Sequence, residues 1–174
     1  MRRLIIFRHA KAERLQPGGS DLSRRLEPRG RNDAEAMGAY LAKHKLVPDL
    51  AAVSTSARTR ETWAFAGAAF VPAPPVSFDG RIYNAETDDI LALIAETDAK
   101  AGTLALVGHN PGFHELAVLL TGSGDAAARQ RLADGFPTAG VAVIDFKGSD
   151  WHLRPHSGRL ERFVSPKSVS AATD

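Results

Sequence analysis

Short apolar runs alternate with segments of helical periodicity from one end of the chain to the other, and this alternation constrains the fold more than any other feature. Runs typical of buried strands occur at residues 4–7, 50–53, 76–78, 103–107, 141–146 and, with a weaker pattern, 158–164. Helical spacing or helix-start signals occupy intervals between them, at 28–44, 55–70, 87–94 and 113–122. Thr55 or Ser56 is the expected capping residue of the second helix, and Thr87 that of the third.

This alternation predicts an α/β domain with a mostly parallel central sheet and helices on both faces, in three α/β/α layers. The length of 174 residues suits one domain. We expect that domain to span residues 1–164, and the polar residues 165–174 to form a C-terminal tail.

Composition narrows the class of protein. The chain is 44% hydrophobic and 24% charged, which is ordinary for a globular protein, and it has no cysteine, so disulfides, thiolate zinc sites and a cysteine nucleophile are excluded. The first apolar run stops after four residues and none approaches the length of a membrane span, so we expect a cytoplasmic protein without a membrane partner. A net charge of +2 favours anionic small molecules or acidic partners but is too small to indicate nucleic acid.

Three of the predicted strands lead to arginine or histidine. The first ends at Arg8-His9, the second leads to Arg58, and the strand at 103–107 leads to His109. Ligands bind at the carboxyl ends of the strands in such sheets, so we expect two arginines and two histidines to meet in one pocket.

The chemistry of that pocket suits a phosphoryl group. Two guanidinium groups offer forked donors for phosphate oxygens, and a neutral imidazole is a competent nucleophile near pH 7. A backbone carbonyl in the loop can fix its tautomer by accepting from Nδ1. Because arginine supplies the positive charge, no cofactor and no metal are expected; His114 lacks the spacing to His109 and the third ligand that a zinc site needs.

These residues carry a resemblance. The segments LIIFRHA at 4–10, SARTRET at 56–62 and VGHNP at 107–111 resemble, in order, three motifs of the histidine phosphatase superfamily, whose fold is phosphoglycerate mutase-like. The stretch DLSRRLEPRGR at 21–31 is also similar to the small SixA-like branch of phosphohistidine phosphatases. The sequence departs from the superfamily pattern at Ala10, where the usual residue is glycine. The resemblance implies that His9 is the nucleophile and that Arg8, Arg58 and His109 bind the phosphoryl group.

The substrate is less constrained. Relatives that cleave phosphomonoesters supply a carboxylic acid to protonate the leaving group, and Glu86 is the candidate here. An imidazole leaving group needs less help, and the roughly thirty residues between Phe70 and Thr103 leave no room for a large lid. We therefore expect phosphohistidine in a partner protein as the substrate. A small phosphorylated metabolite is the alternative, and a non-catalytic phosphate-binding or phosphoprotein-binding domain is a third hypothesis.

Simpler interpretations remain open for several residues. Arg60 is the alternative to Arg58 as the phosphoryl ligand, and Asn110 is expected to shape its turn rather than to bind substrate. The arginines in 24–31 either form a solvated face or steer an acidic partner toward the site.

Overall fold

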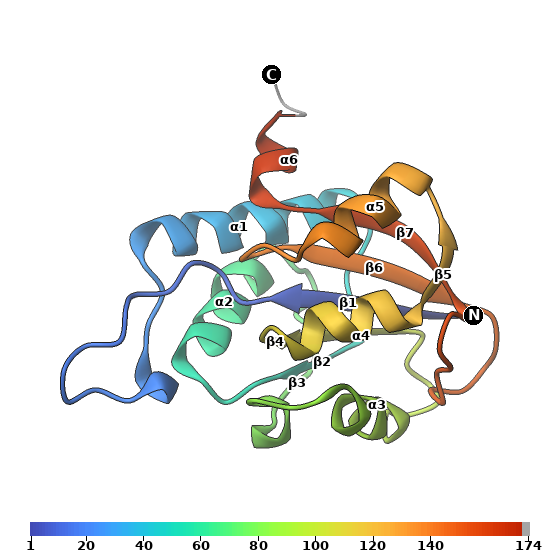
Figure 1. Cartoon of the computed structure of the whole chain (residues 1–174), viewed down its shortest axis with the longest axis horizontal. Coiled ribbons are helices and arrows are strands. Elements are labelled where there is room, and N and C mark those ends of the chain that lie inside the picture. Colours follow the sequence, from blue (N-terminus) through green and yellow to red (C-terminus); the bar gives the residue numbers. More distant parts are fainter. Residues whose placement is uncertain (172–174) are drawn as a thin grey trace.

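The computed structural model describes residues 1–171 as a seven-stranded sheet covered by helices on both faces (Figure 1). The strands are β1 (Arg2–Arg8), β2 (Leu50–Val53), β3 (Val76–Phe78), β4 (Thr103–Gly108), β5 (Thr121–Gly124), β6 (Val141–Phe146) and β7 (Gly158–Val164). The helices are α1 (Pro28–Lys43), α2 (Ala57–Gly67), α3 (Thr87–Ala95), α4 (Gly112–Leu120), α5 (Ala126–Asp134) and α6 (Pro166–Ala171), with 3-10 turns η1 (Asp21–Ser23) and η2 (Gly80–Ile82).

Across the sheet the strand order is β3-β2-β4-β1-β6-β7-β5. Of these strands β6 runs opposite to the others: it pairs antiparallel with β1 and β7, whereas the remaining neighbours are parallel. The structure therefore confirms the predicted three-layer fold with a mostly parallel sheet.

Strand β1 lies in the middle of the sheet and separates two cores. Leu4 and Ile6 pack with α3, α4 and α5 on one face, while Ile5 and Phe7 pack with α1 and α2 on the other. Successive side chains of a strand point to opposite faces, so a continuous apolar run is what a strand covered on both sides requires. This burial fixes the position of the residues that follow β1.

The N-cap residue predicted from the sequence is confirmed for α2 but not for α3. The Ser56 side chain accepts the Thr59 N–H and caps α2, as predicted. Helix α3 begins at Thr87 with Asp88 and Asp89 in its first turn, as predicted, but the capping role predicted for Thr87 was wrong, because Glu86 occupies the N-cap position without a side-chain cap.

Two elements between 121 and 134 had no clear sequence signal. Strand β5 reads TGSG and has no apolar run, and α5 buries only Ala128 and Leu132. Short edge elements with so little buried surface do not produce a hydrophobic period.

Part of the expected tail is ordered. Helix α6 lies within residues 165–174 and contacts α1, and Val169 packs against the core on that face. The boundary at residue 164 stays a prediction. No helix within residues 1–171 is long and apolar enough to cross a membrane.

Candidate active site

The carboxyl ends of β1, β2 and β4 meet at one edge of the sheet. Arg8 is in register with Gly108, and the His9 N–H donates to the Gly108 carbonyl over 3.0 Å. Strand β2 lies on the other side of β4 and leads through residues 54–56 into α2, whose first turn carries Arg58. The structure thus brings together the four residues that the sequence singled out.

His9 is buried and its tautomer is determined by the backbone. Its Nδ1 lies 2.8 Å from the carbonyl oxygen of Ala10, which can only accept, so Nδ1 carries the proton. The Ala10 N–H donates in turn to Thr62 Oγ1 over 3.0 Å. Burial lowers the pKa of His9 to about 3, reinforced by His109, Arg58 and Arg8 and opposed by the Ala10 hydrogen bond. The imidazole is therefore neutral near pH 7 and its Nε2 carries a lone pair.

His109 lies beside His9, with their ring centroids 5.4 Å apart. Both ring nitrogens are engaged: Arg58 Nη2 lies 3.2 Å from Nδ1, and Ser54 Oγ lies 2.7 Å from Nε2. Because a guanidinium can only donate, Nδ1 accepts and Nε2–H donates to the serine. Burial lowers the pKa of His109 to about 4, with Arg58 adding to the effect and Asp21 opposing it.

Arg58 is 5% exposed, whereas Arg60 is exposed and its guanidinium lies over the Phe78 ring at 4.2 Å. Arg58 Nη1 donates to the Asp21 carbonyl over 2.8 Å, and Nη2 donates to Asp21 Oδ2 over 3.0 Å. Of the two arginines, Arg58 is the one beside the histidines.

Arg8 is held by the segment that precedes β6. Its Nη1 donates to the Phe136 carbonyl over 2.9 Å, and the Asn110 amide donates to the same oxygen over 2.9 Å. The Ala139 N–H donates to the His9 carbonyl over 3.0 Å. This segment therefore ties the ends of β1 and β4 together, and Asn110 has a structural contact in the turn, as expected.

Two donors at this edge lack hydrogen-bond partners. The Nε atoms of Arg8 and Arg58 are buried and unpaired within the described chain. Buried guanidinium N–H groups are costly to leave unpaired, and a phosphoryl group supplies the oxygen acceptors that match them. The pocket is thus suited to an oxyanion.

Comparisons with known proteins agree with this geometry. Residues 4–82 match the model of the histidine phosphatase superfamily, branch 1. An uncharacterized protein of Mycobacterium leprae is 34% identical over 167 residues, covering 92% of this chain and all of that protein. The chain belongs to the histidine phosphatase superfamily.

Solved structures place this histidine phosphatase in the SixA-like branch. A protein from Agrobacterium tumefaciens named after the phosphohistidine phosphatase SixA is 32% identical, with a TM-score of 0.79 over 95% of this chain and 98% of that one. A protein from Nakamurella multipartitia with the same designation is 29% identical, with a TM-score of 0.83 over 95% and 96% of the two chains. The family and these neighbours support phosphatase activity and confirm the phosphoglycerate mutase-like fold.

One side of the phosphatase site, which we name the loop wall, consists of residues 10–27 with the start of α2. Glu61 holds it from α2, accepting from Arg25 Nε over 2.8 Å and from the Leu26 N–H over 2.7 Å. Gly30 lies so close to the base of the loop that an added Cβ would come within 2.1 Å of the Lys11 carbonyl. The loop wall is therefore fixed to both α1 and α2.

The arginines of segment 24–31 have different surroundings. Arg24 donates to Asp21 Oδ1 and to the Glu13 carbonyl, Arg25 pairs with Glu61, and Arg29 lies 3.7 Å from Asp33. Two of them hold the loop wall rather than forming an unattached basic patch. Steering of an acidic partner by this segment stays a prediction.

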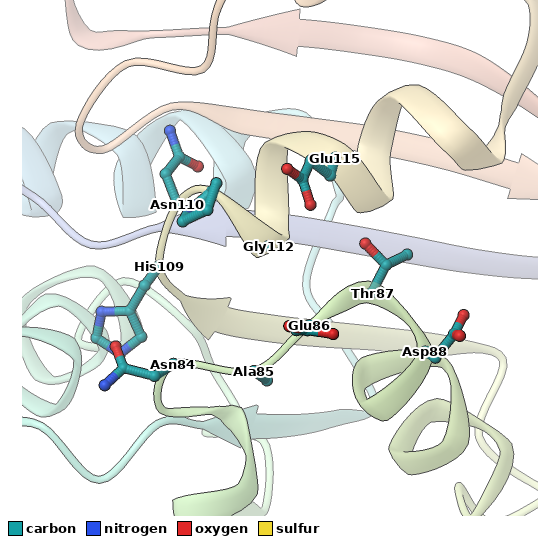
Figure 2. Close-up of a pocket in the computed structure, with 10 residues that line it drawn as sticks. Asn84, Ala85, Glu86, Thr87, Asp88, His109, Asn110, Gly112 and Glu115 are labelled. Carbon is teal, nitrogen blue, oxygen red and sulfur yellow. The ribbon is translucent and has the colours of Figure 1, made fainter.

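On the other side of His109 lies a cavity of about 460 Å³, shown in Figure 2. We name this side the cavity wall; it comprises residues 84–88, 110–112 and Glu115, from the segment entering α3 and the start of α4. In Figure 2 His109 stands at one end and Glu86 and Glu115 face the space between the two segments. Both carboxylates are exposed and make no hydrogen bond or ion pair within the described chain. Glu86, the candidate acid, thus lines the cavity next to His109 without a hydrogen bond or ion pair from its carboxylate within the described chain, and its role as an acid stays a prediction.

Three residues that contact the predicted set had no role in the sequence analysis. Ser54 bonds His109, Asp21 bonds Arg58, and the Tyr83 hydroxyl donates to Asp21 while its ring packs edge-on to His109 at 5.4 Å between centroids. Asp21 lies in the segment that resembles the SixA-like branch, which is the one signal that pointed toward it. Among residues 1–171 no group of three histidine or acidic residues could hold a metal ion.

Proposed function

We propose that this protein is a metal-independent phosphatase that forms a phosphohistidine intermediate on His9 and acts on phosphohistidine in a partner protein. The observation that carries the proposal is the state of His9. It is neutral, its proton is held at Nδ1 by the Ala10 carbonyl, and its Nε2 has no hydrogen-bond partner within the described chain. An imidazole held in this way can attack without first losing a proton.

The reaction then has two displacements. His9 Nε2 attacks phosphorus, the bond from phosphorus to the leaving group breaks, and the leaving nitrogen or oxygen keeps the electron pair and takes up a proton from solvent water. Water next attacks the phosphorus on His9, the P–N bond breaks, and phosphate leaves with His9 neutral again. Arg8 and Arg58 stabilise the negative charge on the phosphoryl oxygens in both steps.

The phosphohistidine substrate is favoured by the character of the cavity wall. Glu86 is exposed and makes no contact that would fix it as an acid, and an imidazole leaving group depends less on an acid than an alkoxide does. The segment between α2 and β4 contains short elements and no long covering insertion. An open site of this kind can accept a histidine on the surface of another protein.

Phosphate release tests the proposal. We would compare a histidine-containing peptide phosphorylated with phosphoramidate against p-nitrophenyl phosphate, in the presence of a chelator. His9→Ala is the test variant and His152→Ala, which alters an exposed histidine far from the site in sequence, is the control. We expect chelator-resistant release that His9→Ala abolishes and His152→Ala preserves. Full activity in His9→Ala would disprove the mechanism.

A small-molecule phosphomonoesterase is the second candidate, because Glu86 lines the cavity next to His109. It predicts turnover of alkyl phosphates that Glu86→Gln reduces strongly. Preference for the phosphorylated peptide, with Glu86→Gln fully active on it, would decide against this alternative.

A further inference from the structure

The loop wall places one carboxylate among donors from three segments of the chain. Asp21 Oδ1 accepts from Arg24 Nη1 over 2.8 Å, and Oδ2 accepts from Arg58 Nη2 over 3.0 Å and from the Tyr83 hydroxyl. The main-chain oxygen of Asp21 also accepts from Arg58 Nη1 over 2.8 Å. One residue therefore fixes two of the three nitrogens of the Arg58 guanidinium.

This arrangement leaves a defined set of Arg58 donors for a ligand. A guanidinium has five N–H groups, and three of those on Arg58 are directed to Asp21 and His109. The Nε–H, which is buried and unpaired, belongs to the remainder. Because the guanidinium is planar, fixing Nη1 and Nη2 also fixes the direction of Nε–H.

Asp21 itself is unsuited to proton transfer. Hydrogen bonds from Tyr83, Arg24 and Arg58 hold the pKa of its carboxyl well below its usual range. It is therefore ionised near pH 7, where it acts as a negative charge and a hydrogen-bond acceptor.

We propose that Asp21 is a positioning residue, which acts through Arg58 to orient its donors toward the phosphoryl group in the transition state. The inference rests on the proposed function of the site. A negative charge beside Arg58 weakens the attraction of the site for phosphate in the ground state, so its benefit lies in geometry. Loss of Asp21 should therefore lower kcat rather than raise KM.

A double-mutant cycle tests whether Asp21 acts through Arg58. The variants are Asp21→Asn, Arg58→Lys and the pair together, with Asp145→Asn as the matched control. Asp145 also pairs with an arginine, lying 2.6 Å from Arg3 Nε near the amino end of β1. We expect Asp21→Asn to lower kcat by about 10–100-fold, with KM changed less than about threefold. In the Arg58→Lys background the same substitution should lower kcat by less than about threefold.

Ligand binding gives a readout that needs no turnover. Calorimetry with orthovanadate, which adopts the geometry of the transition state, should show about tenfold weaker binding to Asp21→Asn, while inorganic phosphate binds within about threefold of wild type. Absence of turnover on every substrate would contradict the proposed function, and the two oxyanions would still decide the role of Asp21.

Three results would overturn the inference: equal losses from Asp21→Asn in both Arg58 backgrounds, equal weakening of both oxyanions, or the same loss in Asp145→Asn. If Asp21→Asn does not fold, Tyr83→Phe replaces it, because it removes a donor to the same carboxylate without changing charge. We expect Tyr83→Phe to lower kcat by about 3–10-fold, and by less than about twofold in the Arg58→Lys background. The same factor in both backgrounds would likewise count against Asp21.

Discussion

The loop wall and the cavity wall flank the same histidine pair, but their charged side chains are held very differently. On the loop wall Asp21, Arg24 and Glu61 each have ionic partners. On the cavity wall Glu86 and Glu115 are exposed and make no ion pair within the described chain.

This difference matches the two halves of a phosphoryl transfer. The transferring group is the same for every substrate, and stabilising its charge demands preorganised donors, which the loop wall provides. The leaving group varies between substrates, and in the proposed function we assign it to the cavity beside His109. Under the proposed function, we therefore expect the site to be more selective for the phosphoryl group, which faces side chains held by ion pairs, than for the leaving group.

The largest effect should come from the centre of the loop wall. Arg58→Ala should lower kcat/KM by about 10²–10³-fold, since it removes buried donors from the developing charge. Arg58→Lys should recover part of the loss, because lysine supplies a charge without the planar fork. Steady-state kinetics measure both. An equal loss in Glu115→Gln, on the cavity wall, would contradict the assignment of charge stabilisation to the loop wall.

Acid should destabilise the fold through the two histidines between the walls. Their pKa values are lowered to about 3 and about 4, so below the ordinary value of 6.5 the unfolded chain binds protons that folded His9 and His109 do not. The free energy of unfolding should therefore fall between pH 7 and pH 5, by about 2 kcal/mol for each histidine.

Urea unfolding at the two pH values measures that loss. His9→Asn should reduce it by about half, whereas His152→Asn, an exposed histidine, should leave it unchanged. A wild-type slope in His9→Asn would show that His9 titrates normally in the folded protein.

Glu61 tests how much of the order in the loop wall comes from one side chain. Glu61→Ala leaves the N–H of buried Leu26 without its acceptor, so we expect a loss of about 2 kcal/mol in the free energy of unfolding and faster proteolysis within residues 13–20. Glu161→Ala is the control. It breaks an exposed pair with Arg159 and should cost less than about 0.5 kcal/mol. Equal effects of the two variants would mean that Glu61 does not anchor the loop.

The smallest effect is expected on the cavity wall. Glu86→Gln should change the free energy of unfolding by less than about 0.5 kcal/mol, because the side chain is exposed and makes no contact that would be lost. Activity on a phosphohistidine peptide should stay within about twofold of wild type. A tenfold loss on that peptide would show that the cavity wall takes part in the chemistry.

Local sequence patterns predict the fold class and three of the residues at the sheet edge, Arg8, His9 and His109, whereas the choice of Arg58 over Arg60 needed the structure. The apolar run before Arg8 is typical of a strand buried on both faces, and parallel strands open at a common edge, so Arg8, His9, Arg58 and His109 were expected to approach one another, as they do in the structure. These are local patterns joined by a single rule of topology. Strand β5 and helix α5 were not predicted, because they bury too few apolar side chains to produce a periodic hydrophobic pattern in the sequence.

The contacts that hold these four residues in place depend on tertiary packing. Asp21 lies 37 residues from Arg58, and Tyr83 lies 62 residues from Asp21, so no periodicity links them. The low pKa of His9 likewise comes from burial and from charges on other segments. The spacing of apolar residues along the chain predicts which helices and strands form. The contacts between loops depend instead on how those helices and strands pack together.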